Sequence, residues 1–297
     1  MDYSFQHYLL AKQSVDDRAL NRHVYQRLSE SLPQAPLRII EAGAGIGSML
    51  VRLLRWGLLT RAEYALVDEM QENLDYAAGW LPRWAAENNM QAQTSAPGQL
   101  RMFDAAREVL VRFERADVLD FARSAPQPAD LLIAHAFLDL LPMPTGLGEL
   151  FGLLKPGGLA WLTINFDGLS SLEPALDPAL DEKIERLYHQ TMDTRPTGGD
   201  SRAGRHLFGH IRSVRASLLA AGASDWVVHA IDGRYPFDEA YFLYFILHFF
   251  EASLAGHPEL DEPTLQTWLA ARRAQIESAE LVYIAHQTDF LVKLKDG

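Results

Sequence analysis

Short apolar runs alternate with amphipathic stretches over the first 165 residues of the chain. Four runs have the length and composition of buried strands: RII at 38–40, YALVD at 64–68, ADLLIAH at 129–135 and LAWLTIN at 159–165. Helical periodicity follows the first three of them, at 48–56, 74–84 and 148–154. Segment 88–99 is rich in turn residues and predicts a loop, with a hairpin or a long strand after it over 100–117. This order predicts an α/β fold with a parallel, doubly wound sheet and right-handed crossovers.

The segments that flank this core, 37–165, have other patterns. Ser14 and Asp17 resemble a capping box, and apolar residues at 20, 24 and 28 then mark one helical face, which predicts an N-terminal helical segment over 1–36. The rest of the chain is expected to hold an insertion, a core helix and strand, a helical cap and a closing strand, over 166–209, 210–237, 238–280 and 281–297. Within the second of these regions, 210–237, we expect a helix over 211–222 and a strand over 225–231.

Composition and charge narrow the class of protein. The 297 residues allow one large domain, or a core with insertions. The formal net charge of −12 argues against broad contact with nucleic acid. The absence of cysteine excludes disulfides, zinc–thiolate sites and cysteine nucleophiles. The first twenty residues lack the apolar core of a signal peptide, and the apolar run at 241–250 is half the length of a membrane span. We therefore expect a soluble cytoplasmic protein without membrane or nucleic-acid partners.

The loop between the first strand and its helix carries three glycines, Gly43, Gly45 and Gly47. A dinucleotide-binding loop would place its third glycine at position 48, where this chain has Ser48, and a phosphate-binding P-loop would need a lysine that is absent nearby. Glu41 stands two positions before the first glycine, where it would repel a pyrophosphate and attract a cationic amine or sulfonium. The loop therefore predicts a ligand other than a phosphate.

This E-x-G-x-G-x-G segment resembles the class I S-adenosylmethionine-dependent methyltransferase family. The resemblance implies a Rossmann-like, mostly parallel seven-stranded sheet with an antiparallel last strand, and S-adenosyl-L-methionine as the cofactor. It also implies that Glu41 and the glycine loop bind the methionyl part of the cofactor. Asp68, at the end of the second strand, would bind both ribose hydroxyls, Asp117 the exocyclic amine of adenine and the Val118 amide a ring nitrogen.

The sequence indicates the residues that would act on an acceptor less clearly than those that would bind the cofactor. His135 follows the fourth predicted strand, where it would contact the cofactor, act as a base or serve as a structural histidine. Arg202, Arg205 and His206 belong to a basic segment without an acid, which fits either a solvated helix face or a clamp for an anionic substrate. Tyr241 begins an aromatic segment that fits a core helix or a lid over the acceptor. Too few possible ligands stand near His135 in the sequence to support a metal site.

These observations predict a methyltransferase for a small-molecule acceptor, one that is anionic if the basic segment is a clamp. Two other classes stay open. One is a catalytically inactive protein that retains the S-adenosylmethionine pocket, and the other is an NAD(P)-dependent oxidoreductase, which Ser48 and Glu41 disfavour. A homodimer is the assembly we allow for. The sequence does not identify the acceptor.

Overall fold

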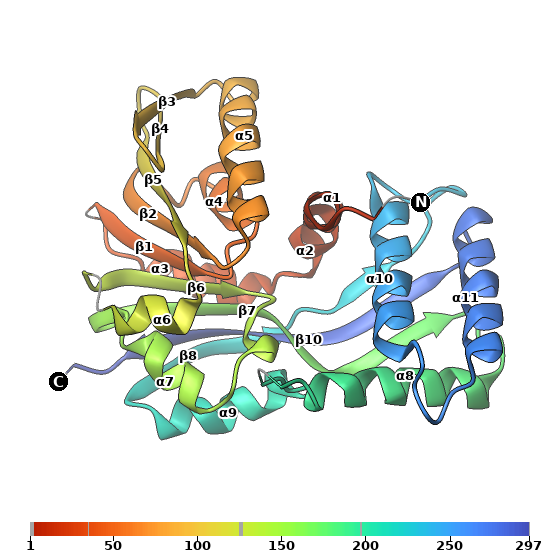
Figure 1. Ribbon diagram of the computed structural model, residues 1–297. Helices are drawn as coiled ribbons and strands as arrows, with labels where there is room; N and C mark the ends of the chain where they lie inside the picture. The colour runs from red at the N-terminus through yellow and green to blue at the C-terminus, as the bar shows by residue number, and fades with distance from the viewer. Residues whose placement is uncertain (1–2, 35, 125–126, 197, 297) are drawn as a thin grey trace.

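The computed structural model describes residues 3–34, 36–124, 127–196 and 198–296. Over these residues the chain forms one ten-stranded sheet with helices on both faces (Figure 1). The strands are β1 Leu37–Ala42, β2 Arg61–Asp68, β3 Gln91–Ala96, β4 Gln99–Phe103, β5 Glu108–Arg115, β6 Ala129–His135, β7 Leu154–Glu173, β8 Ala216–Ala223, β9 Trp226–Val228 and β10 Val282–Leu294. The helices are α1 Phe5–Ala11, α2 Gln13–Ala19, α3 Arg22–Ser31, α4 Ser48–Arg55, α5 Gln71–Glu87, α6 Val118–Arg123, η1 Leu138–Leu140, α7 Thr145–Phe151, α8 Pro178–Asp193, α9 Ala203–Ser213, α10 Glu239–Leu254 and α11 Glu262–Glu277. Within this described part, no helix is both long and apolar enough to cross a membrane.

The sheet confirms the predicted mostly parallel, doubly wound architecture. Its strand order is β3-β4-β5-β2-β1-β6-β7-β10-β8, and β9 pairs with β10. Strands β5, β2, β1, β6 and β7 are parallel, whereas β10 runs antiparallel to both β7 and β8. The predicted seven-stranded core is therefore present, with β10 as its antiparallel member, and β3, β4 and β9 are additions to it.

Alternation along the central strands builds two apolar cores, one on each face of the sheet. Ile39, Leu131 and Ile133 belong to the core that α3, α4 and α5 cover. Their neighbours Ile40 and Leu132 belong to the other core, which contains α6, α7 and α9. Successive side chains of a strand point to opposite faces, so a strand buried on both sides is apolar throughout. This explains why the central strands are readable as continuous apolar runs.

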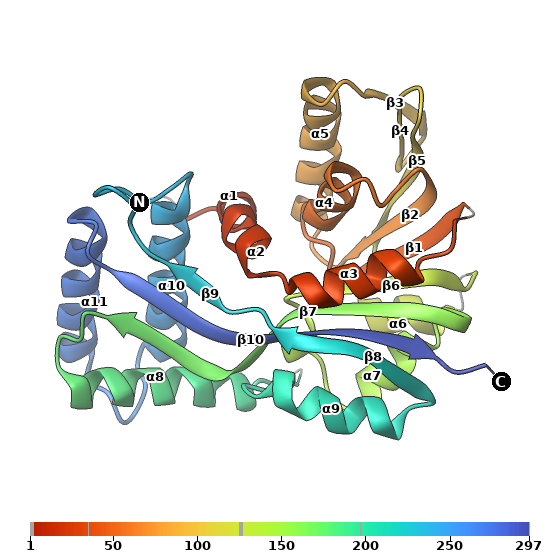
Figure 2. The same ribbon diagram turned by 180° about the vertical axis from the view of Figure 1, so that it is seen from behind.

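The long strands β7 and β10 extend past this core and carry a second group of helices. Figures 1 and 2 show α8, α10 and α11 around the extension, while α1 and α2 lie between it and α4 and α5. Strand β7 continues eight positions past Asn165, to Glu173, so the expected insertion 166–209 begins as a strand. The two helices expected over 238–280 are α10 and α11.

Three local expectations were wrong. Residues 211–222 are not one helix: α9 ends at Ser213 and β8 begins at Ala216, because pairing with β10 outweighs the helix propensity of the alanines and leucines there. The loop expected over 88–99 contains β3, which forms a hairpin with β4 through Gly98, whose φ is +71°. The N-terminal segment is three helices, and Ser14 donates a hydrogen bond to Glu239 instead of capping one.

Candidate active site

A cavity of about 940 Å³ opens at the carboxyl ends of β1, β2, β5 and β6. This volume lies near the upper end of the range for small-molecule sites, roughly 300–1,000 Å³, so two ligands fit side by side. One part of its wall, which we call the loop half, comes from Glu41, Gly43, Gly45, Asp68, Asp117 and Val118. The opposite part, the distal half, comes from β7, α8, α10 and β10 and the segment after α8, and includes Phe166, Ser170, Tyr188, Met192, Arg195, Phe249, Tyr283 and Gln287. Helices α1 and α2 contribute Tyr8, Lys12 and Asp16 between the halves.

The glycine loop needs its glycines for backbone shape and for space. Gly43, Gly45 and Gly47 have φ angles of +64°, +53° and +78°, which side-chain-bearing residues rarely adopt. A Cβ atom on Gly43 would lie 2.2 Å from the Phe137 ring. Gly43 and Gly45 line the cavity, whereas Gly47 is the N-cap of α4 and a Cβ there would lie 3.2 Å from Leu66. The first two glycines thus border the ligand space, and the third allows close packing behind it.

Asp68 ends β2 with both carboxylate oxygens held by the protein. One oxygen accepts a hydrogen bond from the Gly45 amide at 2.7 Å, and the other accepts from the Met70 amide at 2.9 Å and the Asn73 side chain at 3.1 Å. A carboxylate has about four acceptor sites and three are used here, so this arrangement fixes the orientation of Asp68 and leaves about one site for a ligand. Asp68 therefore presents an oriented acceptor to the loop half of the cavity.

Glu41 is buried at the end of β1 and accepts a hydrogen bond of 2.6 Å from the Tyr64 hydroxyl. Burial raises the pKa of Glu41 to about 8, against the hydrogen bond from Tyr64 and the charge of Arg52. A cationic ligand group beside this carboxyl would favour its ionised form. The loop half therefore contains an acid that gains a charge when a cation binds.

Asp117 and Val118 lie at the first turn of α6, where they line the loop half. The Asp117 side chain caps the helix by accepting from the amides of Leu119 and Asp120, at 2.8 and 3.0 Å. The structure thus brings together the cofactor residues predicted from the sequence, with Gly47 behind the wall.

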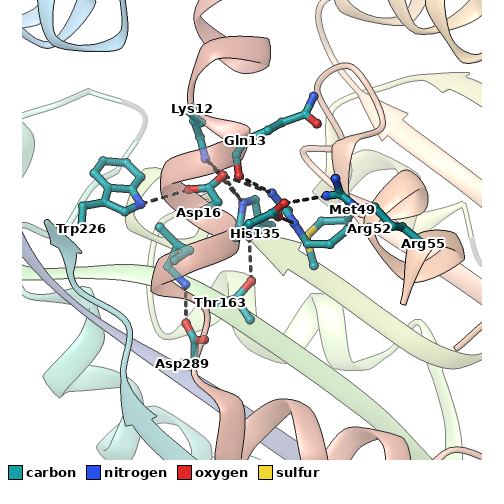
Figure 3. A network of polar contacts seen from close by, with 12 residues as sticks. Lys12, Gln13, Asp16, Met49, Arg52, Arg55, His135, Thr163, Trp226 and Asp289 are labelled. Atoms are coloured by element: carbon teal, nitrogen blue, oxygen red, sulfur yellow. Dashed lines mark hydrogen bonds and ion pairs between the residues drawn. The ribbon is translucent and has the colours of Figure 1, made fainter. Parts of the chain in front are cut away.

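His135 lies in a buried polar network that joins β6 and β7 to α2 (Figure 3). Its Nε2 donates to a carboxylate oxygen of Asp16 at 2.8 Å, and its Nδ1 accepts from the Thr163 hydroxyl at 2.8 Å. Lys12 donates to the same Asp16 oxygen at 2.8 Å, and Trp226 donates to the other oxygen at 3.0 Å. The neutral ring thus uses both nitrogens within the protein.

Charge and burial fix the protonation states in this network. Burial lowers the pKa of His135 to about 4, although the carboxylate of Asp16 opposes the shift. Burial alone would raise the pKa of Asp16, but Lys12, His135 and Arg52 outweigh it and hold that pKa well below its usual value. The network is therefore a neutral imidazole beside a fixed carboxylate and an ammonium. This geometry favours the structural alternative for His135 over the role of a base.

The residues expected to bind the acceptor lie elsewhere. Arg202, Arg205, His206 and Tyr241 are not part of the cavity wall. Arg205 pairs with Asp167 of β7 at 2.6 Å, and His206 pairs with Asp200, which directly precedes the basic segment, at 2.7 Å, so acids outside the segment neutralise both side chains. Tyr241 accepts a hydrogen bond from the Ser4 amide at 2.8 Å and joins α10 to the N-terminus.

Several residues of the cavity wall were not predicted. On α1 and α2 these are Phe5, Tyr8, Leu9, Lys12 and Asp16, whose spacing of three or four residues marks one helical face. That spacing was a usable signal. Arg195 and Gln287 had none, because one follows α8 in a glycine-rich stretch and the other is a polar residue inside a strand.

Neither protein-family models nor curated protein sequences match this chain. Solved structures do. A candidate methyltransferase from Bacillus halodurans C-125 is similar over 93% of this chain and 100% of its own, with a TM-score of 0.50 and 10% identity. An S-adenosylmethionine-dependent methyltransferase from Thiobacillus denitrificans, solved with S-adenosyl-L-homocysteine, is similar over 99% of this chain and 100% of its own, with a TM-score of 0.47 and 13% identity. At such identities the likeness concerns the fold.

Proposed function

We propose that this chain, which has the fold of the class I S-adenosylmethionine-dependent methyltransferases, methylates a small-molecule acceptor. The observation that carries the proposal is the convergence of Glu41, the glycine loop and Asp68 on one half of a cavity that extends well beyond them. An oxygen-rich, acidic loop half suits a diol and a cation. The distal half then provides room for the acceptor.

The donor groups in the loop half fit S-adenosylmethionine. Glu41 and the backbone at Gly43 and Gly45 would hold the methionyl part. Asp68, with about one acceptor site left beside its three protein donors, would accept a hydrogen bond from a ribose hydroxyl. Asp117 and Val118 would hold the adenine. When bound, S-adenosylmethionine would supply an activated methyl group on a sulfonium and would leave as S-adenosylhomocysteine.

The protein's own contribution is to orient the acceptor and to exclude water. Tyr8, on α1, and Lys12, between α1 and α2, are buried residues of the cavity wall. His135 acts as a positioning residue in this proposal, because it fixes Asp16, which in turn fixes Lys12. Lys12 is 5% exposed. Its ammonium has three N–H donors, one of which binds Asp16, so donors remain for an oxygen of the acceptor.

A dinucleotide fits this wall poorly. The pyrophosphate of NAD(P) would approach the carboxyl of Glu41, and Ser48 stands where a dinucleotide-binding loop has its third glycine. An inactive S-adenosylmethionine-binding protein would need only the loop half, so the aromatic distal half supports an enzyme.

Isothermal titration calorimetry with S-adenosylmethionine, S-adenosylhomocysteine and NADH tests the cofactor. We expect the two sulfur compounds to bind with one site per chain and NADH to give no heat of binding. Binding of NADH in place of the sulfur compounds would overturn the proposal. Transfer of radiolabelled methyl groups to a panel of small acceptors then separates an enzyme from a binding protein.

A further inference from the structure

Three cationic side chains line the cavity, and they differ in their partners. Lys12 pairs with Asp16 at 2.8 Å, and Arg123 pairs with Asp120 at 2.6 Å and with Glu149 at 2.9 Å. Arg195 has no ion pair with any residue in the described ranges. Its Nη1 atom is buried and has no hydrogen-bond partner among those residues either. Arg195 is thus a cation of the cavity wall whose charge the described protein does not neutralise by contact.

An unpaired buried donor is costly, and more so when it carries charge. The carboxyl of Asp139, also in the cavity wall, is influenced by the charge of Arg195, but no ion pair or hydrogen bond joins the two side chains. Burial raises the pKa of Asp139, and the charges of Arg195 and Lys12 only partly offset this. The described residues therefore leave the guanidinium of Arg195 without a direct anionic partner. A ligand with its own negative charge would supply one.

The wall around Arg195 is apolar and aromatic, which limits the rest of that ligand. Tyr188 and Met192 come from the same face of α8, and Phe166 and Phe249 face the cavity from β7 and α10. The Oε1 atom of Gln287, on β10, is also buried without a hydrogen-bond partner. The distal half thus offers a cation, a free carbonyl acceptor and flat apolar surfaces.

We propose that Arg195 binds an anionic oxygen group, a carboxylate or a phosphate, on an aromatic or aliphatic acceptor whose apolar body packs in the distal half. The inference rests on the proposed function, since it names the class of acceptor for that same cavity. A guanidinium presents parallel N–H donors that match the two oxygens of either group. Gln287 then accepts a hydrogen bond from a hydroxyl or amine of the same molecule.

The test is calorimetry on the protein loaded with S-adenosylhomocysteine. The probes are 3-phenylpropionate, phenyl phosphate and the uncharged 3-phenylpropionamide. We expect wild type to bind at least one anion about ten- to a hundredfold more tightly than the amide, as one charge-assisted contact allows. The tighter anion identifies the group. Arg195→Gln should abolish this preference, Arg195→Lys should keep part of it, and Asp139→Asn should increase it by removing a competing carboxylate.

Arg186→Gln is the matched control, because this exposed arginine lies on α8 outside the cavity wall and should leave the preference unchanged. Affinity for S-adenosylhomocysteine should stay near wild type in all four variants, which also shows that they fold. Equal binding of the anions and the amide by wild type, no binding of any probe, or an intact preference in Arg195→Gln would each overturn the inference. If S-adenosylhomocysteine itself fails to bind, the proposed function fails, and the same probes on the unloaded protein still decide the role of Arg195.

Discussion

Removal of the Asp68 carboxylate should weaken cofactor binding by a calculable amount. In the proposed complex the carboxylate keeps its three protein donors and accepts one hydrogen bond from the ribose, worth roughly 1.5–3 kcal/mol because the acceptor is charged. Asp68 is only 9% exposed, so bulk water recovers little of this loss in Asp68→Ala. Since each 1.4 kcal/mol is a factor of ten, we expect affinity for S-adenosylhomocysteine to fall by about one to two decades.

Asp68→Asn sharpens this prediction. The two oxygens of Asp68 accept from three donors, the amides of Gly45 and Met70 and the side chain of Asn73. The NH₂ group of an asparagine would face a donor in either orientation. The asparagine should therefore impair binding nearly as much as alanine does, although it retains the shape.

Calorimetry measures the affinity of both variants for S-adenosylhomocysteine. A thermal melt measures the stability that each variant loses with the hydrogen bonds between residue 68 and the glycine loop. Asp75→Ala is the control, because this exposed acid on α5 removes the same charge outside the cavity wall. Wild-type affinity in Asp68→Ala would refute our placement of the ribose. An equal loss in Asp75→Ala would show that net charge, and not the contact, is responsible.

Three further predictions concern the same cavity. Gly43→Ala should cost about 1–3 kcal/mol of stability and weaken S-adenosylhomocysteine binding, since φ is +64° and the new Cβ meets Phe137. Gly57→Ala is the control for backbone strain alone, because Gly57 has a φ of +72° and open space around it. If calorimetry shows the same loss of S-adenosylhomocysteine affinity in both variants, contact with the Phe137 ring plays no part. The contribution of Glu41 to the stability of the unliganded protein should fall as the pH rises from about 4.5 to about 8, because the unfolded chain ionises Glu41 first and the pKa of the folded group is about 8. Thermal melts of wild type and Glu41→Gln should therefore differ in slope over this range, and parallel curves would contradict the prediction. His135, with a pKa of about 4, should stay neutral above about pH 5.5 in ¹⁵N NMR, and its own contribution to stability should fall as the pH drops from 6.5 to about 4; a midpoint near 6.5 would show that the ring is not buried.

The parts of the fold that could be predicted are those whose burial depends on local pattern. Strands β1 and β6 are buried on both faces, so their apolar runs are visible in the sequence, and the glycine loop follows β1 directly. Strand β8 could not be predicted, because its partner β10 lies some seventy residues later and its alanines and leucines favour a helix by themselves.

The candidate site divides in the same way. Glu41 and Asp68 follow strands, and a parallel sheet brings the carboxyl ends of its strands to one edge, so position alone indicated their place. Lys12 and Asp16 reach the cavity only because the segment with α2 crosses that edge of the sheet. Their place therefore depends on tertiary packing, which the local sequence does not show. Segment 201–215, around Arg205, suggested a clamp because it contains no acid, yet Asp167, from β7, lies 2.6 Å from Arg205.

The route of the chain through the sheet has a consequence for its autonomy. Residues 37–165 contain every cofactor motif, yet β7 borders β10, which the last part of the chain supplies. A fragment limited to that stretch would end inside β7 and leave its hydrogen-bonding edge unpaired, a template for aggregation. It would also lose α3, which packs against β8 and β10 from before the first motif. The part of the chain proposed to bind the cofactor is therefore completed by segments on both sides of it in the sequence, and we expect the protein to tolerate circular permutation better than truncation.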